Sequence, residues 1–133
     1  MEFIDLKAQQ KLIRESLNTS INKVLDDGRY ILGEEVSALE NKLSSFCGAK
    51  YSIGCSNGTD ALIIALLALG IKPGDGVITV PFTYIATLEA IATIGAIPVL
   101  VDVYDSTFNM NPELIDEVIK NSEYNIKAIM PVD

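Results

Sequence analysis

The chain has 133 residues, with 10 basic and 18 acidic side chains, and its formal net charge is −8. Because Lys and Arg nowhere cluster, this charge argues against nucleic-acid binding. The sequence holds no histidine and two cysteines, Cys47 and Cys55. This excludes a histidine-based triad within these residues and argues against a metal site or a disulfide framework.

The chain carries no pattern typical of membrane targeting. Its first ten residues are acidic and amphipathic, unlike a signal peptide. Residues 77–101 are largely apolar, but prolines, a glycine and Glu89 interrupt them. We therefore expect a soluble, cytoplasmic protein.

The first third of the chain predicts two helices. Apolar residues recur every three or four positions over residues 8–27, before Gly28, and again over residues 34–46, before Gly48. The short connector GRYILG, residues 28–33, links them. We assign residues 1–48 to this helical region.

From Tyr51 onward, short strands alternate with helices. The expected strands are residues 50–56, 77–80, 97–103 and 126–132. The expected helices are residues 58–69, 85–94 and 111–121, the last capped by Asn111. Continuous apolar strands are typical of a mostly parallel sheet with helices on both faces, a three-layer α/β/α fold. The helix at 58–69 is apolar almost all round, so we expect it to be buried.

We assign residues 49–133 to one domain, and expect it to be incomplete. The last predicted strand ends next to Asp133, with no helix after it to close the layer.

The segment GCSNGTDA, residues 54–61, predicts a ligand site between a strand and a helix. In parallel α/β sheets, ligands bind where strands end and helices begin. Gly58 lets the backbone approach a ligand, while Thr59 and Asp60 lie in a first helical turn whose free N–H groups favour a phosphate. The alternative is that Ser56 or Asn57 simply caps the helix. The segment matches neither a P-loop nor a dinucleotide fingerprint.

A second informative segment is VPFTY, residues 80–84. Phe82 and Tyr84 follow a predicted strand and lie near the same edge of the sheet, where an aromatic ring could cover a flat ligand. The alternative is that both are ordinary core aromatics.

Four segments together resemble the DegT/DnrJ/EryC1/StrS aminotransferases, and they are DDGRYILGEEV, SNGTDAL, LGIKPGDGVITVPFTYIATLEAI and GAIPVLVDVYDSTFNMNPE. These are pyridoxal-phosphate enzymes of the aspartate-aminotransferase fold (type I) that act on nucleotide-linked keto-sugars. The resemblance covers essentially the whole chain. It implies that the chain is the N-terminal part of the large domain of that fold, working as a homodimer.

The resemblance also implies roles for individual residues. Gly58 and Thr59 would hold the phosphate of pyridoxal 5'-phosphate, with Asp60 in the same turn. Tyr84 would stack on its pyridine ring.

Three further residues are implied on the substrate side. Arg29 and Tyr30 would contact the sugar nucleotide near the dimer interface. Glu89 is a weaker candidate, whose alternative is a carboxylate on a helix surface.

The resemblance places the catalytic residues outside this chain. Transamination needs a lysine that forms a Schiff base with the cofactor and an acidic partner for the ring nitrogen. In the family both lie downstream of the region seen here, and no lysine of this chain matches the family's catalytic motif. We expect the 133 residues alone to be inactive.

The implied reaction moves an amino group, with L-glutamate as donor, to the keto group of a UDP- or dTDP-linked hexose, in surface-polysaccharide or amino-sugar biosynthesis. The opening of the chain looks most like members that aminate the 3-position. The alternatives are a non-catalytic remnant or oligomerising binding module, a sugar dehydratase of the same fold, and an unrelated dinucleotide-binding protein.

Overall fold

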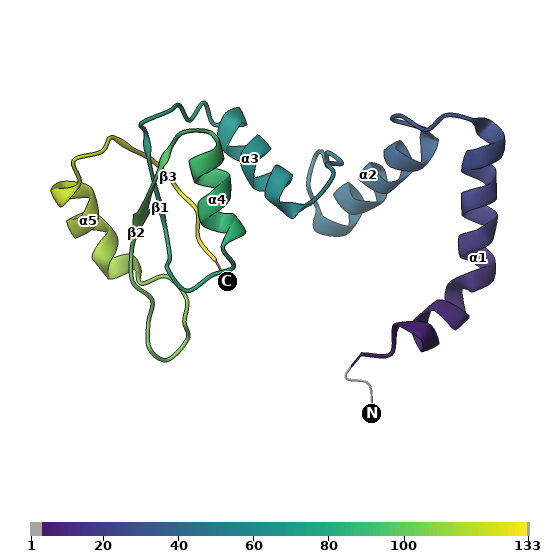
Figure 1. The fold of residues 1–133 in the computed structure, drawn as a ribbon, viewed down its shortest axis with the longest axis horizontal. Helices are drawn as coiled ribbons and strands as arrows, with labels where there is room; N and C mark the ends of the chain where they lie inside the picture. Colours follow the sequence, from purple (N-terminus) through teal and green to yellow (C-terminus); the bar gives the residue numbers. More distant parts are fainter. Residues whose placement is uncertain (1–3, 133) are drawn as a thin grey trace. The chain divides into compact units, whose positions relative to one another are not determined.

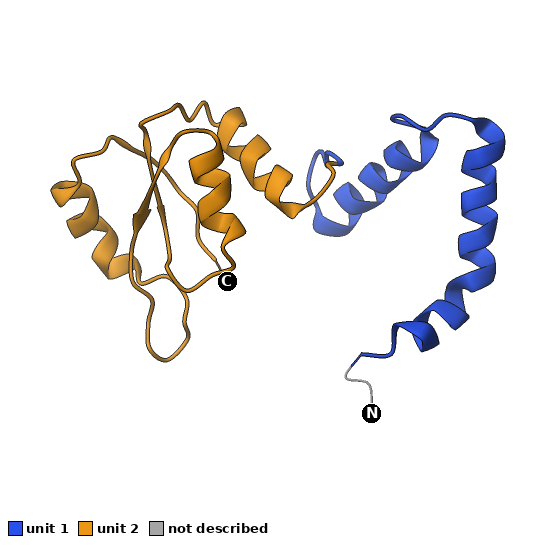
Figure 2. Cartoon of the chain, in the orientation of Figure 1, with its two compact units in different colours: residues 1–54 blue, residues 55–133 orange. Residues whose placement is uncertain are grey.

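The computed structural model describes residues 4–132 and shows two compact units, Met1–Gly54 and Cys55–Asp133 (Figure 2). The first unit contains α1 (Leu6–Asp27) and α2 (Glu34–Cys47). The second contains α3 (Gly58–Ala68), β1 (Gly76–Thr79), α4 (Ala86–Thr93), β2 (Ile97–Leu100), the 3-10 helix η1 (Pro112–Leu114), α5 (Ile115–Asn121) and β3 (Ile126–Ile129).

Both helices of the first unit end at the glycines that their sequence indicates, and α1 begins two residues before its predicted range of 8–27. The Asp5 side chain caps α1 by accepting a hydrogen bond from the N–H of Ala8 at 2.9 Å. Gly28 and Gly48 follow α1 and α2 in the left-handed conformation, with φ of 65° and 68°, which glycine adopts without strain. The two predicted helices are thus confirmed.

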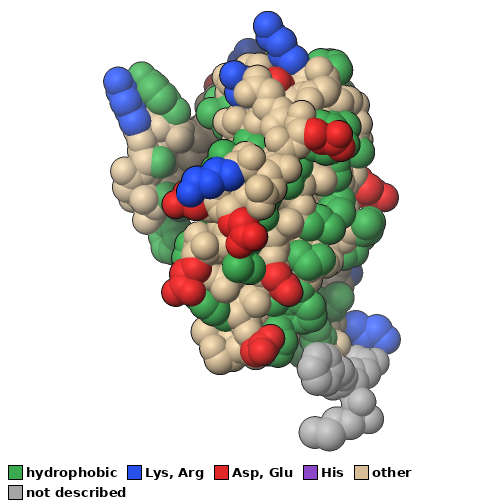
Figure 3. Space-filling view, turned by 90° about the vertical axis from the view of Figure 1, so that its left-hand side faces the viewer, with side chains coloured by type: hydrophobic (Ala, Val, Ile, Leu, Met, Phe, Trp, Pro, Cys, Tyr) green, Lys and Arg blue, Asp and Glu red, His purple; other side chains and the backbone are tan. Residues whose placement is uncertain are grey.

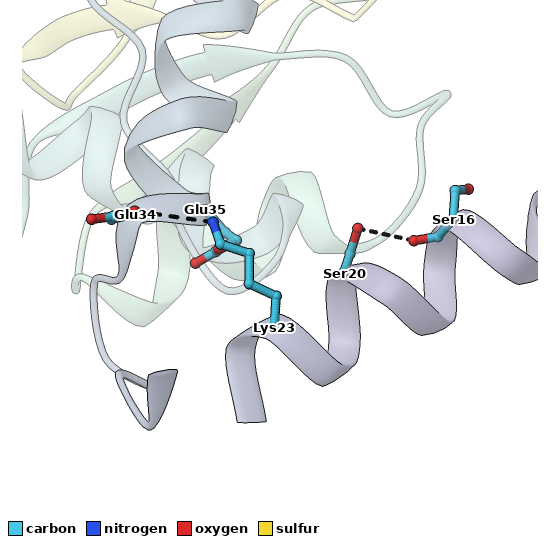
Figure 4. Close-up of polar contacts among 5 residues, drawn as sticks. All are labelled: Ser16, Ser20, Lys23, Glu34 and Glu35. Atoms are coloured by element: carbon cyan, nitrogen blue, oxygen red, sulfur yellow. Dashed lines mark hydrogen bonds and ion pairs between the residues drawn. The ribbon is translucent and has the colours of Figure 1, made fainter. Parts of the chain in front are cut away.

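An ion pair links α1 to α2 (Figure 4). Lys23 Nζ lies 2.9 Å from Glu35 Oε1 and 4.0 Å from Glu34 Oε2. The hydrogen bond between Lys23 and Glu35 lowers the pKa of the Glu35 carboxyl and raises the pKa of Lys23. Because these groups are largely exposed, the pair contributes little to stability.

The apolar stripe of α1 is exposed. Neither α1 nor α2 has a buried residue in the part of the chain that the structure describes. The exposed apolar side chains of α1 include Leu12, Leu17, Ile21 and Leu25.

The second unit is built on a parallel sheet with the strand order β2-β1-β3. The middle strand, β1, is buried along its whole length, and its Val77 lies opposite Pro98 on β2 and Ala128 on β3. Figure 1 shows α5 on one side of this sheet and α3 and α4 on the other. The three-layer α/β/α fold with a parallel sheet is confirmed.

The core lies between the sheet and the pair α3 and α4. Leu66 of α3 and Ile91 of α4 pack with Val77 of β1, Ile71 and Ala96. On the same strand, the buried Thr79 hydroxyl donates to the carbonyl of Met130 at 2.9 Å, which ties β1 to the end of β3. This packing fixes where β1 ends.

Two sequence predictions are wrong. Residues 50–56 form no strand, and the described sheet consists of β2, β1 and β3 alone. The N–H of Gly54 instead donates to Glu40 Oε1 at 2.8 Å. The helix α3 is not buried as expected, since only Leu66 is buried, whereas Ile64 and Leu67 are about half exposed. A helix that is apolar on every side is fully buried only when other residues pack against all of its sides. The described residues bury one side of α3.

A side chain at position 76 is predicted to crowd its neighbours. A Cβ there would lie 2.5 Å from Ile126 Cδ1 and 3.2 Å from Tyr124 Cβ. We expect Gly76→Ala to lower the free energy of unfolding by about 1–3 kcal/mol through overpacking. Gly58→Ala is the matched control, because nothing lies within 4 Å of its Cβ position. Denaturant unfolding of both variants tests this, and equal midpoints would contradict it.

Candidate functional site

The candidate site is the start of α3, which Asn57 caps. Asn57 has an extended backbone, and its Oδ1 accepts from the N–H of Asp60 at 2.9 Å. Its carbonyl accepts from the N–H of Ala61 at 3.1 Å. Asn57, rather than Ser56, is therefore the residue that caps α3.

The cap leaves two backbone donors free. The first N–H groups of a helix have no partner within it, and here the cap uses those of Asp60 and Ala61. Between residues 4 and 132, no hydrogen bond uses the N–H of Gly58, the N–H of Thr59 or the Thr59 hydroxyl. With the helix dipole behind them, these three donors form a seat for an anion.

The Asp60 carboxylate faces the preceding loop. Its Oδ2 accepts from the Ser56 hydroxyl and from Asn57 Nδ2, the latter at 3.1 Å. This arrangement holds the Ser56–Asn57 loop against the first turn of α3. It also occupies the Ser56 hydroxyl.

Nothing in the fold requires a glycine at position 58. Its φ lies outside the left-handed region, and nothing lies within 4 Å of its Cβ position. The missing side chain therefore leaves open space beside the free donors, which is the room that a bound ligand needs.

Tyr84 belongs to the segment that connects β1 to α4. Its side chain is 80% exposed and that of Phe82 is 62% exposed, so the interpretation as core aromatics is wrong for both. The segment is attached to α4 by a hydrogen bond of 2.9 Å between the Thr83 and Thr87 hydroxyls. The N–H of Thr87 also donates to the carbonyl of Tyr84 at 3.1 Å.

The topology brings the start of α3 and the Tyr84 segment to one side of the second unit. The helices α3 and α4 pack together, and both begin on the side where β1 and β2 end (Figure 1). An anion seat and an exposed aromatic ring thus lie in one layer of the fold.

The remaining predicted residues are exposed but take no part in this arrangement. Glu89 lies in the first turn of α4. Arg29 and Tyr30 belong to the other unit, in the connector between α1 and α2, where the Tyr30 hydroxyl donates to the carbonyl of Leu25 at 3.4 Å.

The charged side chains of the described residues bear on two other kinds of site, for metals and for membranes. In the face drawn in Figure 3, acidic side chains are scattered among apolar ones. Among residues 4–132, no three His, Cys, Asp or Glu side chains gather as metal ligands would. Every helix in that range is too short or too polar to cross a bilayer.

Comparison with known proteins identifies the family. The model of the DegT/DnrJ/EryC1/StrS aminotransferase family matches residues 11–133. The chain belongs to this family. The resemblance carried by the four sequence segments is thereby confirmed.

Two curated members of the DegT/DnrJ/EryC1/StrS family show the relationship in sequence. The UDP-2-acetamido-2-deoxy-3-oxo-D-glucuronate aminotransferase of Pseudomonas aeruginosa is 52% identical over 99% of this chain and 36% of its own length. The UDP-N-acetyl-3-dehydro-alpha-D-glucosamine 3-aminotransferase of Acidithiobacillus ferrooxidans is 44% identical over 97% of this chain and 34% of its own. The chain spans about a third of the length of these relatives.

Solved structures confirm the fold. A DegT/DnrJ/EryC1/StrS aminotransferase from Brucella abortus superposes with a TM-score of 0.93 at 47% identity, over 100% of this chain and 37% of that one. NtdA from Bacillus subtilis, solved with the cofactor pyridoxamine phosphate bound, gives a TM-score of 0.80 at 35% identity, over 88% of this chain and 26% of that one. The fold is that of the N-terminal part of these pyridoxal-phosphate-dependent enzymes.

The cap on α3 predicts a separable effect on stability. We expect Asn57→Ala to lower the free energy of unfolding by about 1 kcal/mol, because the Asp60 N–H loses its acceptor. Asn57→Ser keeps an acceptor oxygen for the cap and brings no second carboxylate next to Asp60, so it should be closer to the parent. Denaturant unfolding of the two variants checks this, and an equal loss in both would mean that the cap is not the cause.

Proposed function

We propose that the chain carries the phosphate seat and the ring-stacking tyrosine of a pyridoxal-phosphate site, within an aminotransferase for nucleotide-linked keto-sugars. The observation that carries this proposal is the pair of unpaired N–H groups of Gly58 and Thr59 at the start of α3. Family membership then indicates which phosphate compound the seat takes.

The residues present fit that cofactor. A phosphate dianion accepts several hydrogen bonds, and the free N–H groups of Gly58 and Thr59 together with the Thr59 hydroxyl supply three donors at the positive end of a helix dipole. The open space beside Gly58 lets the phosphate approach the backbone. Asp60 supports the seat through Ser56 and Asn57 rather than by touching the phosphate, since two anions in contact would repel each other.

Tyr84 supplies the second contact. An exposed phenol ring in the segment between β1 and α4 has the shape and polarity to stack on a pyridine ring, and the Thr83–Thr87 hydrogen bond limits how far that segment can move. When bound, pyridoxal phosphate supplies the electron-accepting ring that amino transfer requires. These residues bind and orient that ring.

The substrate side follows from the relatives. We propose a UDP- or dTDP-linked 3-keto-hexose as amino acceptor and L-glutamate as donor, with Arg29, Tyr30 and Glu89 as candidate substrate contacts. The two curated relatives carry names of UDP-linked 3-keto-sugar aminotransferases, which supports the 3-position.

We further propose a cytoplasmic homodimer in which residues 1–48 precede a cofactor-binding domain over 49–133. The catalytic lysine would come from sequence outside these 133 residues.

The activity is tested on the purified natural protein. It is incubated with pyridoxal phosphate, L-glutamate and a UDP-linked 3-keto-hexose. We expect 2-oxoglutarate and a 3-amino sugar nucleotide in equal amounts, measured by mass spectrometry. Loss of a sugar hydroxyl without amino transfer would instead indicate a dehydratase.

The phosphate seat is tested by filling it. Gly58→Val places a side chain in the open space beside the free donors, so we expect the dissociation constant for pyridoxamine 5'-phosphate to rise roughly tenfold or more. Ala68→Val, at the exposed far end of the same helix, is the matched control and should leave binding unchanged. Calorimetric titration measures both. Equal affinities in the two variants would remove Gly58 from the site.

A further inference from the structure

The loop between β2 and η1 is a closed turn that holds one aromatic ring in place. Val103 and Met110 form an antiparallel bridge at its base. Across it, the N–H of Tyr104 donates to the carbonyl of Asn109 at 3.0 Å, and the N–H of Phe108 donates to the carbonyl of Tyr104 at 2.8 Å. These bonds leave the backbone of Phe108 little freedom.

Phe108 has an unusual backbone conformation. Its φ is +60°, in the left-handed region that a large side chain rarely adopts. Such a conformation persists where the surrounding contacts determine it, and it often marks a functional constraint. The hydrogen bonds of the turn hold this conformation, and the Phe108 ring packs on Phe82, with the two ring centroids 5.1 Å apart and their planes tilted by 31°. That spacing falls within the favourable range for aromatic pairs.

Phe82 lies two residues before Tyr84, on the segment between β1 and α4. The other side of this segment is fixed by the hydrogen bond between Thr83 and Thr87. The segment that carries Tyr84 is therefore held on one side by α4 and on the other by the ring of Phe108.

We propose that Phe108 is a positioning residue for the cofactor ring: by packing on Phe82, it fixes the segment from which Tyr84 stacks. This inference rests on the proposed function. It assigns to the loop after β2 a role in binding the ring of the cofactor and none in binding its phosphate, which the start of α3 holds.

The exposure of the pair makes this testable without unfolding the protein. Phe108 is 53% exposed and Phe82 is 62% exposed, so neither ring is part of the core. Three variants separate the ring from the backbone. Phe108→Ala removes the ring, Phe108→Gly removes it and also relieves the positive φ, and Phe108→Tyr keeps a ring.

The probe is pyridoxamine 5'-phosphate, which has no aldehyde and so cannot bond covalently to a lysine. We expect the Ala and Gly variants to raise its dissociation constant roughly three- to tenfold, and the Tyr variant to restore it. The affinity for inorganic phosphate should stay unchanged in all three. A Gly variant that binds like the parent would overturn the proposal, since backbone conformation alone would then suffice.

A double-mutant cycle with Tyr84→Ala distinguishes positioning from a general structural effect. If Phe108 acts through Tyr84, then Phe108→Ala has no further effect once Tyr84 is gone. Additive losses would overturn the proposal. The proposed function fails separately, and takes this inference with it, if the parent does not bind pyridoxamine 5'-phosphate at all.

Discussion

The first N–H groups of a helix have no hydrogen-bond acceptor within the helix, and the candidate site in the second unit depends on this constraint. At the start of α3, Asn57 satisfies the N–H groups of Asp60 and Ala61, and those of Gly58 and Thr59 remain open. The only acidic side chain in this turn, Asp60, is engaged by Ser56 and Asn57. What remains is an uncrowded, positively polarised helix end.

The parallel sheet gives this helix end its neighbours. Because β1 and β2 run in the same direction, the segments that follow them leave the same edge of the sheet. One segment carries Tyr84, and the other carries Phe108, which packs on Phe82. The cofactor site would thus have two separable parts. The phosphate would bind at the start of α3, and the ring would stack on Tyr84, whose segment Phe108 holds in place.

The sequence predicts much of this fold because burial leaves a clear pattern. The strands around 77–80, 97–100 and 126–129 are recognisable as apolar runs, and glycines mark where helices stop. Residues 50–56 contain apolar side chains too, but apolarity does not reveal whether a partner strand exists, and in the described sheet no strand pairs with them. For the same reason, the composition of α3 indicates an apolar helix but does not predict how much of it is buried. Among the described residues of α3, only Leu66 is buried.

The candidate site divides in the same way. The free N–H groups of Gly58 and Thr59 can be predicted from the local sequence. The hydrogen bonds of the cap that leave them unpaired join residues three or four positions apart. Whether Ser56 or Asn57 caps the helix depends on side-chain geometry, which the sequence leaves open. The contact between Phe82 and Phe108 joins positions 26 residues apart, and a positive φ is expected of glycine or asparagine rather than phenylalanine. No sequence pattern indicates it.

The central claim is that the backbone of Gly58 and Thr59 binds the cofactor phosphate. The most direct test follows their amide resonances by NMR during titration with pyridoxal 5'-phosphate and, separately, with pyridoxal. The account predicts that both amide protons shift downfield in a saturable way with the phosphorylated compound and stay in place with pyridoxal. Equal shifts with the two compounds, or shifts confined to other residues, would contradict it.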